Sequence, residues 1–167
     1  MRYPLRMPVN KVYASLLKSV LHNVGVAFVA FGLALLGTLV DRLLGVAGFA
    51  YPLATGTGLG LLVLGFLVRV WATFHFYEHG MRVISLTPQR ALITAGPYRF
   101  SRNPLYLGGN VFMFFGAALL EGSPTALVAT AIHIPLMDRF VRREEVQLER
   151  DFGEAWRSYK QRVRRWL

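Results

Sequence analysis

The sequence predicts an all-α integral membrane protein with about four transmembrane helices, a cytoplasmic loop and amphipathic C-terminal helices. Three observations lead to this fold class. Hydrophobic residues make up 54% of the chain and charged residues 17%, and the mean hydropathy is +0.40. The apolar residues are gathered in blocks without charge, and the basic residues lie between the blocks. At 167 residues we expect a single domain, residues 1–167.

Two long apolar blocks predict the first two membrane helices. Residues 20–40 and 52–68 contain no Asp, Glu, Lys or Arg, and each has about the 20 residues that a helix needs to cross the hydrocarbon core. We therefore place two N-terminal transmembrane helices within residues 1–75. In the second block, Gly56, Gly58, Gly60 and Gly65 are typical of close helix packing. Arg69 follows near the expected cytoplasmic end, where its side chain can extend to the membrane surface.

Two shorter apolar runs predict a helical hairpin in residues 104–167. Residues 105–120 and 125–137 flank the turn Glu121-Gly122-Ser123-Pro124. A run of about 16 residues, such as 105–120, gives about 24 Å of helix at about 1.5 Å per residue. The hairpin therefore spans a thin bilayer or tilts little. Together with residues 20–40 and 52–68, the hairpin makes four transmembrane helices, the last two short.

The distribution of basic residues predicts the orientation in the membrane. The net charge is +10, yet 17 of the 19 Lys and Arg residues fall in the N-terminal segment, the loop 76–103 or the C-terminal tail. These three segments share one side of a four-helix arrangement, as the positive-inside rule requires. Both termini and the 76–103 loop are therefore expected in the cytoplasm, and nucleic acid is not needed to explain the charge.

A first candidate site is the letter pattern His75-x-x-Glu78-His79. On a helix the two histidines share a face, as in one class of zinc peptidases. The alternative, which we favour, is a pair of interfacial histidines flanked by aromatic residues. The chain has no cysteine, so it offers no thiolate ligand or catalytic thiol, and we assign no metal.

A second candidate site lies where the third helix begins. Asn103 is expected as its N-cap and Pro104 as its first residue. Backbone N–H groups at such a terminus favour a carboxylate or phosphate, and Arg102 beside it adds a charged donor. Gly108 and Gly109 allow a bulky group to approach the backbone. The alternative is that the basic residues of this segment contact lipid phosphates and Asn103 only caps the helix.

The third candidate site is the pair Glu144-Glu145, placed where the fourth helix leaves the membrane. Two carboxylates there can bind a cation or ribose hydroxyls, or can instead form a solvated helix face. Gly153 is a natural helix stop. Beyond it, Trp156 and Tyr159 lie on one face of a basic amphipathic segment, which is expected to lie along an anionic membrane surface.

Two stretches of the sequence resemble a known family. Residues 92–108, which contain Gly96-Pro-Tyr-Arg99 and Arg102-Asn-Pro-Leu-Tyr106-Leu-Gly108, and residues 143–166 with Glu144-Glu145 are similar to the isoprenylcysteine carboxyl methyltransferase-like family, to which phospholipid N-methyltransferases are related. The resemblance covers about residues 92–166, with Arg69-Val-Trp71 also fitting. In that family the corresponding segments enclose S-adenosylmethionine at the cytoplasmic border of the membrane.

The resemblance implies a set of functional residues. The implied catalytic residues are Arg102, Glu144 and Glu145. The implied cofactor-binding residues are Gly96, Pro97, Tyr98, Arg99, Arg102, Asn103, Pro104, Tyr106, Leu107, Gly108, Glu144 and Glu145. We further expect the amino-acid end of the cofactor near Arg102, its hydroxyls or ammonium near the two glutamates, and aromatic packing from Tyr98 and Tyr106.

The chain departs from the family pattern at Asn103, where the family has histidine. An asparagine keeps the helix cap but is no base at neutral pH, which bears on carboxyl methylation more than on cofactor binding. The resemblance thus implies S-adenosylmethionine-dependent methyl transfer to a lipophilic acceptor, namely a prenyl-thiol carboxylate, an isoprenoid or a lipid. A non-catalytic membrane binding protein on the same fold is the alternative, and a zinc peptidase a lesser one. The acceptor and the oligomeric state stay open.

Overall fold

The computed structural model describes residues 8–81, 83 and 91–167, and these are helical without any strand. Two long helices come first, α1 (Val9–Leu44) and α2 (Pro52–Glu78). A single 3₁₀ turn follows, η1 (Gly96–Arg99). The next three elements run on without a break: α3 (Pro104–Tyr106), the π-helical η2 (Leu107–Met113) and α4 (Phe114–Glu121). The last helix is α5 (Pro124–Arg162).

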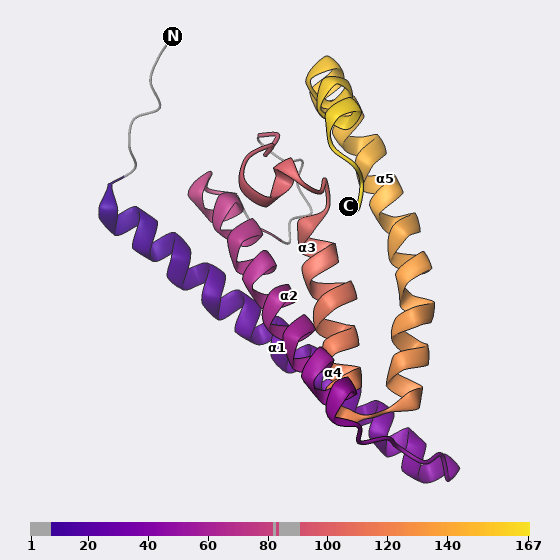
Figure 1. Cartoon of the computed structure of the whole chain (residues 1–167). Helices are drawn as coiled ribbons and strands as arrows, with labels where there is room; N and C mark the ends of the chain where they lie inside the picture. Colours follow the sequence, from indigo (N-terminus) through magenta and orange to yellow (C-terminus); the bar gives the residue numbers. More distant parts are fainter. Residues whose placement is uncertain (1–7, 82, 84–90) are drawn as a thin grey trace.

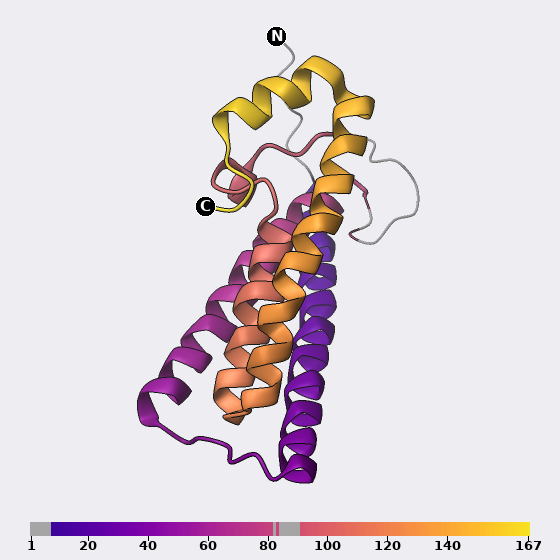
Figure 2. The same cartoon turned by 90° about the vertical axis from the view of Figure 1, so that its right-hand side faces the viewer.

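The helices form an elongated bundle with two different ends (Figure 1). At one end, which we call the turn end, lie the connection between α1 and α2 and the short turn between α4 and α5 (Figure 2). At the other, the loop end, lie the end of α2, the segment 91–103 and the second half of α5. Helix α2 packs against η2 and α4, and α1 packs against α2, α4 and α5.

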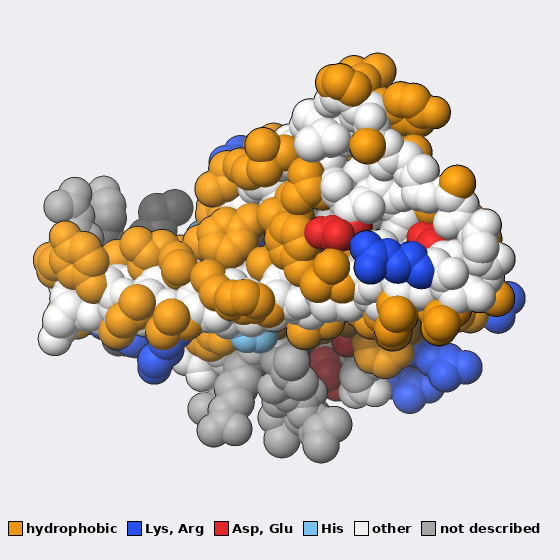
Figure 3. Space-filling model, turned by 90° about the horizontal axis from the view of Figure 1, so that it is seen from below, with side chains coloured by type: hydrophobic (Ala, Val, Ile, Leu, Met, Phe, Trp, Pro, Cys, Tyr) orange, Lys and Arg blue, Asp and Glu red, His pale blue; other side chains and the backbone are white. Residues whose placement is uncertain are grey.

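Three helices are long and apolar enough to cross a membrane, Val9–Leu44, Pro52–Glu78 and Pro104–Glu121. The first half of α5 returns beside α4, so the predicted hairpin is present, with a shorter apolar return arm. Seen from below, the bundle is covered largely by hydrophobic side chains (Figure 3). With 36 residues, α1 is about 54 Å long, which exceeds the thickness of the hydrocarbon core. The predicted all-α membrane architecture is confirmed.

Glycines allow α2 to pack closely against the continuous helical segment formed by α3, η2 and α4, which we call the α3–α4 rod. The glycine-rich block of residues 56–65 predicts this close packing. A Cβ on Gly58 would lie 2.8 Å from the carbonyl oxygen of Gly116, and a Cβ on Gly116 would lie 2.7 Å from that of Gly58. Gly65 and Gly108 face each other in the same way. The prediction holds for two of the four glycines, because Gly56 and Gly60 have no neighbour within 4 Å.

A buried carboxylate joins α1 to α5 at the turn end. Asp41, only 3% exposed, accepts hydrogen bonds from the hydroxyls of Ser123 and Thr125 and from the backbone N–H of Thr125. The Ser123 hydroxyl also accepts the N–H of Ala126, which caps α5. The backbone N–H of Phe49 donates to the carbonyl of Gly122, so both connections at this end are fixed to each other.

We expect Asp41→Asn to destabilise the bundle, because its amide places N–H groups against the donors of Ser123 and Thr125. Hydrogen bonds to a charged group are worth about 1.5–3 kcal/mol each, so the midpoint of thermal unfolding in detergent, followed by tryptophan fluorescence, should fall by several degrees. The exposed neighbour Arg42 supplies the control, and Arg42→Gln should shift the midpoint much less. Equal shifts in the two variants would contradict this account.

Candidate functional site

The segments singled out in the sequence meet at the loop end around a cavity of about 200 Å³. Side chains from α2, the 92–93 segment, η1, α3, η2 and both halves of α5 line it. Five of the predicted cofactor-binding residues are in the lining, namely Tyr98, Asn103, Pro104, Tyr106 and Glu144. The others in the lining are Arg69, Phe76, Val83, Leu92, Ile93, Leu105, Asn110, Leu148, Trp156 and Tyr159.

The remaining predicted residues do not line this cavity. Gly96 has a φ of +59°, and a Cβ there would overlap the His75 ring, so only glycine fits where η1 begins. Pro97 and Leu107 are buried in η1 and η2, and Arg99 ends η1. Gly108 packs against α2.

Arg102 is bound entirely within the protein. Its Nε donates to Glu145 Oε1 at 3.0 Å and its Nη2 to Oε2 at 3.2 Å. Its Nη1 donates to the carbonyls of Lys160 at 3.1 Å and Val163 at 2.9 Å, and the guanidinium lies 5.8 Å from the centre of the Trp156 ring. In this arrangement Arg102 connects the loop to α5 and does not line the cavity.

Glu145 is the centre of that connection. It is 6% exposed and also accepts from Arg165 Nη2 at 2.7 Å. Burial by itself would raise the pKa of Glu145, but the hydrogen bond from Arg165 and the charge of Arg102 outweigh burial and hold the pKa below its usual value. Glu145 is therefore an ionised residue that forms ion pairs with two arginines.

The C-terminal tail is fixed on the same network. The backbone N–H of Arg102 donates to the carbonyl of Arg164 at 2.9 Å, and Ser101 Oγ donates to that of Arg165 at 3.0 Å. Trp166 Nε1 donates to Asp138 at 3.2 Å. Figure 1 shows the C-terminus folded back between α3 and α5. The tail is thus fixed to the loop and to α5 beside the site.

Glu144 has a different environment from its neighbour. It lines the cavity and accepts a hydrogen bond from the Tyr106 hydroxyl at 2.9 Å. The residue as a whole is exposed, but burial of its carboxyl at the cavity mouth raises its pKa above the usual value, and the Tyr106 hydrogen bond offsets only part of the rise. The two adjacent carboxyls are thereby pushed to opposite sides of their usual pKa, a pattern seen where acid and base roles are divided.

The aromatic residues after Gly153 face inward, not toward a membrane surface. Gly153 has a φ of 51° and bends α5, which confirms the predicted stop. Trp156 and Tyr159 are each 2% exposed, and the Tyr159 hydroxyl donates to the carbonyl of Tyr98 at 2.7 Å. The expected membrane-surface segment was therefore wrong for this face, because the bend turns both rings onto the cavity and η1.

Two buried polar groups in the cavity wall lack a partner in the described part of the chain. They are the Tyr98 hydroxyl and the Trp156 Nε1–H. Burial raises the pKa of Tyr98 well above its usual value, so the group is a neutral O–H. Buried polar groups are almost always hydrogen-bonded in proteins. This pair therefore fits a ligand with polar atoms, and both residues face the cavity.

Asn103 occupies the predicted N-cap position, with Pro104 as the first helical residue. Its side chain makes no cap hydrogen bond. Instead, Nδ2 donates to Glu145 Oε1 at 3.3 Å and to the carbonyl of Arg165 at 3.4 Å. The asparagine therefore belongs to the Glu145 network.

Arg69 does not extend to the membrane surface as expected. It is 8% exposed, and its Nε donates to Asn23 Oδ1 at 2.7 Å and its Nη1 to the carbonyl of Leu105 at 2.8 Å. Gly108 and Gly109 make room for it, since a Cβ on Gly109 would lie 2.6 Å from Nη1. The bulky group that approaches these glycines is thus a side chain of α2.

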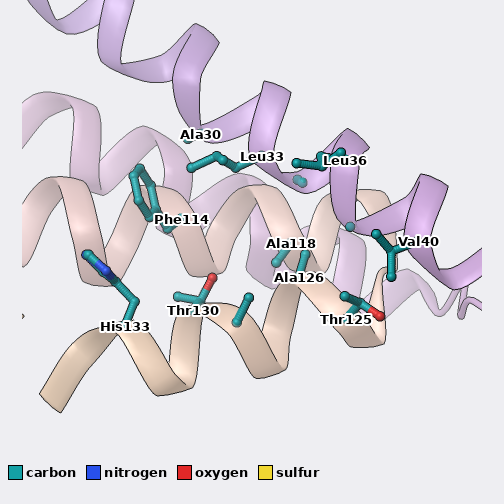
Figure 4. A pocket seen from close by; sticks show the side chains of 13 residues that line it. Ala30, Leu33, Leu36, Val40, Phe114, Ala118, Thr125, Ala126, Thr130 and His133 are labelled. Atoms are coloured by element: carbon teal, nitrogen blue, oxygen red, sulfur yellow. The ribbon is translucent and has the colours of Figure 1, made fainter. Parts of the chain in front are cut away.

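A second, apolar cavity of about 370 Å³ lies between α1, α4 and α5 (Figure 4). Ala30, Leu33, Phe114 and Thr130 are among its lining residues. His133 lies at one end of the cavity, where the centre of its ring is 6.0 Å from that of the Phe114 ring. His133 Nε2 is also 3.1 Å from Asn110 Nδ2, and Asn110 lines the first cavity. This hydrogen-bonded pair therefore connects the two cavities.

Sequence reasoning missed several residues of the site. Arg69 was treated as a surface anchor, and Asn110 and Trp156 were not singled out as site residues. The available signal was polarity inside an apolar run, because polar side chains within membrane helices are costly and are found mainly at functional positions.

The histidine pattern forms a local pair. His75 Nδ1 is 3.1 Å from Glu78 Oε2, and His79 Nδ1 is 2.7 Å from the carbonyl oxygen of His75. Among residues 8–81, 83 and 91–167, no three His, Cys, Asp or Glu side chains are placed to hold one metal ion. The structure therefore gives no support to a zinc site here.

The depressed pKa of Glu145 predicts a pH-dependent contribution to stability. A carboxyl with a lowered folded-state pKa stabilises the protein above its unfolded-state value of about 4.3 and loses this effect as the pH falls through the folded-state value. Glu145→Gln should lower the unfolding midpoint near neutral pH, and the gap to wild type should shrink as the pH falls below about 4.3 and on through the lowered folded-state pKa. A gap independent of pH would contradict an ionised Glu145.

Comparison with known proteins agrees with the arrangement of these segments. Residues 53–155, more than half of the chain, match the family model described as phospholipid methyltransferase. Over 47 residues the chain is 45% identical to an uncharacterized protein of Haemophilus influenzae, which covers 28% of this chain and 75% of that protein. No solved structure matches the chain significantly. The chain, whose cavity-lining residues other than Trp156 and Tyr159 lie in the matched region, belongs to the phospholipid methyltransferase family.

Proposed function

We propose that this protein transfers a methyl group from S-adenosylmethionine to a lipophilic acceptor at the cytoplasmic face of a membrane. The observation that carries the proposal is the polar cavity at the loop end, which lies directly beside an apolar cavity within the bundle. Membership of a methyltransferase family supports the reaction class. The concentration of basic residues at the loop end supports a cytoplasmic site.

The polar cavity offers the groups that such a cofactor requires. The Tyr98 hydroxyl and the Trp156 N–H are donors without partners in the described chain, and the Phe76, Tyr106 and Trp156 rings provide flat apolar surfaces. Bound S-adenosylmethionine supplies an electrophilic methyl group on a positively charged sulfur. The residues around it have only to hold the acceptor near the methyl and keep it there.

The acceptor chain fits the apolar cavity between α1, α4 and α5. That cavity is lined mainly by aliphatic side chains. The Asn110–His133 pair marks the border with the polar cavity, so a reactive headgroup placed there would face Glu144 and Tyr106. A thiolate or carboxylate headgroup attacks without losing a proton, whereas an amine must lose one.

Glu144 is the candidate base for an amine acceptor. Its raised pKa makes it a better proton acceptor than an ordinary glutamate, and Tyr106 holds its carboxyl in position. Arg102 and Glu145 act differently in this proposal. Their hydrogen bonds hold the loop and the tail against α5, so they position the site without contacting the reacting atoms.

A non-catalytic binding protein on the same fold is the second candidate. Asn103, in place of the histidine of the related isoprenylcysteine enzymes, favours it. Consumption of S-adenosylmethionine during incubation with membrane lipid extract distinguishes the two functions. A binding protein would bind the cofactor without consuming it.

Tyr98→Phe should weaken S-adenosylmethionine binding without destabilising the protein. The hydroxyl has no partner in the described chain, so its loss costs little on folding, whereas losing one hydrogen bond to a ligand is worth about 0.5–1.5 kcal/mol, or roughly twofold to tenfold in Kd. Calorimetry and thermal unfolding in detergent measure the two effects.

Tyr159→Phe is the matched control for that experiment. It also removes one phenolic hydroxyl, but this hydroxyl donates to the Tyr98 carbonyl, so the variant should lose stability. Unchanged affinity in Tyr98→Phe, with wild type binding the cofactor, would refute the role of the Tyr98 hydroxyl. Failure of folded wild type to bind S-adenosylmethionine would refute the proposed function.

Glu144→Gln should reduce methyl transfer to an amine lipid by roughly 100-fold or more, the usual contribution of a general base. In wild type, kcat/KM should rise with pH through the raised pKa of Glu144, because only the ionised carboxylate accepts a proton. The variant should lose this rise. Glu149→Gln, on the same helix and paired with Lys160, should retain wild-type rates. A similar pH profile in Glu144→Gln would rule out Glu144 as the base.

A further inference from the structure

Arg69 is a positive charge inside the bundle that the reaction scheme above does not use. It lies on α2 within a membrane-spanning helix and is 8% exposed. A buried ionisable residue in such a helix is costly, and it is found mainly where it contributes to function. The contacts of Arg69 show whether an anionic group of the protein pairs with it.

The partners of Arg69 within the described chain are neutral. They are the Asn23 amide oxygen at 2.7 Å, the Leu105 carbonyl at 2.8 Å and the His22 ring at 3.5 Å. All nine Asp and Glu residues of the sequence lie in the described segments, and none of them is within 4.0 Å of Arg69. The guanidinium thus has hydrogen bonds but no counter-charge.

The other buried arginine of the site shows the contrast. Arg102 has a comparable burial, and it forms a bidentate pair with Glu145. The same carboxylate also pairs with Arg165. The fold thus neutralises these two cations and leaves Arg69 without a carboxylate, although Glu144 lines the same cavity as Arg69.

Arg69 lines the polar cavity together with the two partnerless donors, the Tyr98 hydroxyl and the Trp156 N–H. A guanidinium has five N–H donors in a planar fork that matches carboxylate and phosphate. The three hydrogen bonds of Arg69 use three of these five donors. The Tyr98 hydroxyl, the Trp156 N–H and the remaining N–H groups of Arg69 can each donate to an acceptor on a ligand. The charge of Arg69 favours an acceptor that is negatively charged.

We propose that Arg69 is the anion-binding residue of this cavity and that it binds a carboxylate or phosphate of a ligand. The proposal deepens the proposed function and rests on it for the identity of the ligands. Two sources share this chemistry, the carboxylate of S-adenosylmethionine and an anionic headgroup on the lipophilic acceptor. The Asn23 and Leu105 contacts hold the guanidinium in place before the ligand arrives.

The first arm of the test measures preference for the cofactor carboxylate. Binding of S-adenosylmethionine and of decarboxylated S-adenosylmethionine is measured by calorimetry on wild type and Arg69→Gln. If the carboxylate is the ligand, wild type should prefer the carboxylated form by at least about tenfold, in keeping with a charge-assisted pair, and the variant should lose most of that preference. The ratio between two ligands is insensitive to a general loss of fold.

The second arm measures preference for an anionic headgroup, with hexadecyl phosphate and hexadecanol as probes in the same detergent. If the headgroup is the ligand, wild type should bind the phosphate more tightly and Arg69→Gln should not. Loss of either preference in Arg69→Gln supports the proposal and identifies the source. Both preferences unchanged in Arg69→Gln, or neither present in wild type, overturns it. This arm needs no cofactor, so it can succeed where the proposed function fails.

Matched variants separate charge from structure. Thr73→Val removes the hydroxyl bonded to Asn23 in the same buried cluster without changing charge, and this variant should keep the preference for the anionic ligand. Arg69→Lys keeps the charge and should retain part of that preference. Equal loss of the preference in the Lys and Gln variants would indicate a structural role and overturn the proposal. Should Arg69→Gln not fold, Asn110→Asp places a carboxylate in the same cavity and should abolish the preference, and retention of the preference overturns the proposal.

Discussion

The ion pairs around Glu145 are the interaction on which the site depends. One buried carboxylate receives Arg102 from the loop and Arg165 from the tail, and so joins three stretches of chain that are far apart in sequence. Removing one member of a buried pair leaves an uncompensated charge, which costs much more than the pair contributes. The loop, the second half of α5 and the tail therefore form together or not at all, and the polar cavity exists only where they meet.

The membrane architecture was readable from the sequence because it follows from simple physical limits. Uncharged runs of sufficient length and a one-sided distribution of basic residues predict helices and their order. The glycine pattern also predicted the close approach of α2 to the α3–α4 rod, correctly at Gly58 and Gly65. These features depend on local composition, so each of them can be predicted from a single segment of the sequence.

The detailed site was less predictable because its contacts join distant segments. Asn103 stands at the helix start that its pattern indicates, yet its side chain bonds to Glu145 and to the tail. Trp156 and Tyr159 have the spacing of a surface amphipathic helix, but the bend at Gly153 turns them inward. Arg69 looked like an anchor near a helix end. Only the packing of α1 and α3 against α2 shows that the guanidinium is enclosed.

If the proposed function holds, the contact between Asn110 and His133 has a consequence for how the cofactor and the lipid share this protein. One cavity is reached at the loop end and the other lies between helices inside the bundle. Neither ligand then crosses the space that the other occupies, so the steady-state kinetics are free to follow a random order of addition. In that regime the demethylated cofactor competes with its parent and leaves the apparent affinity for the lipid unchanged.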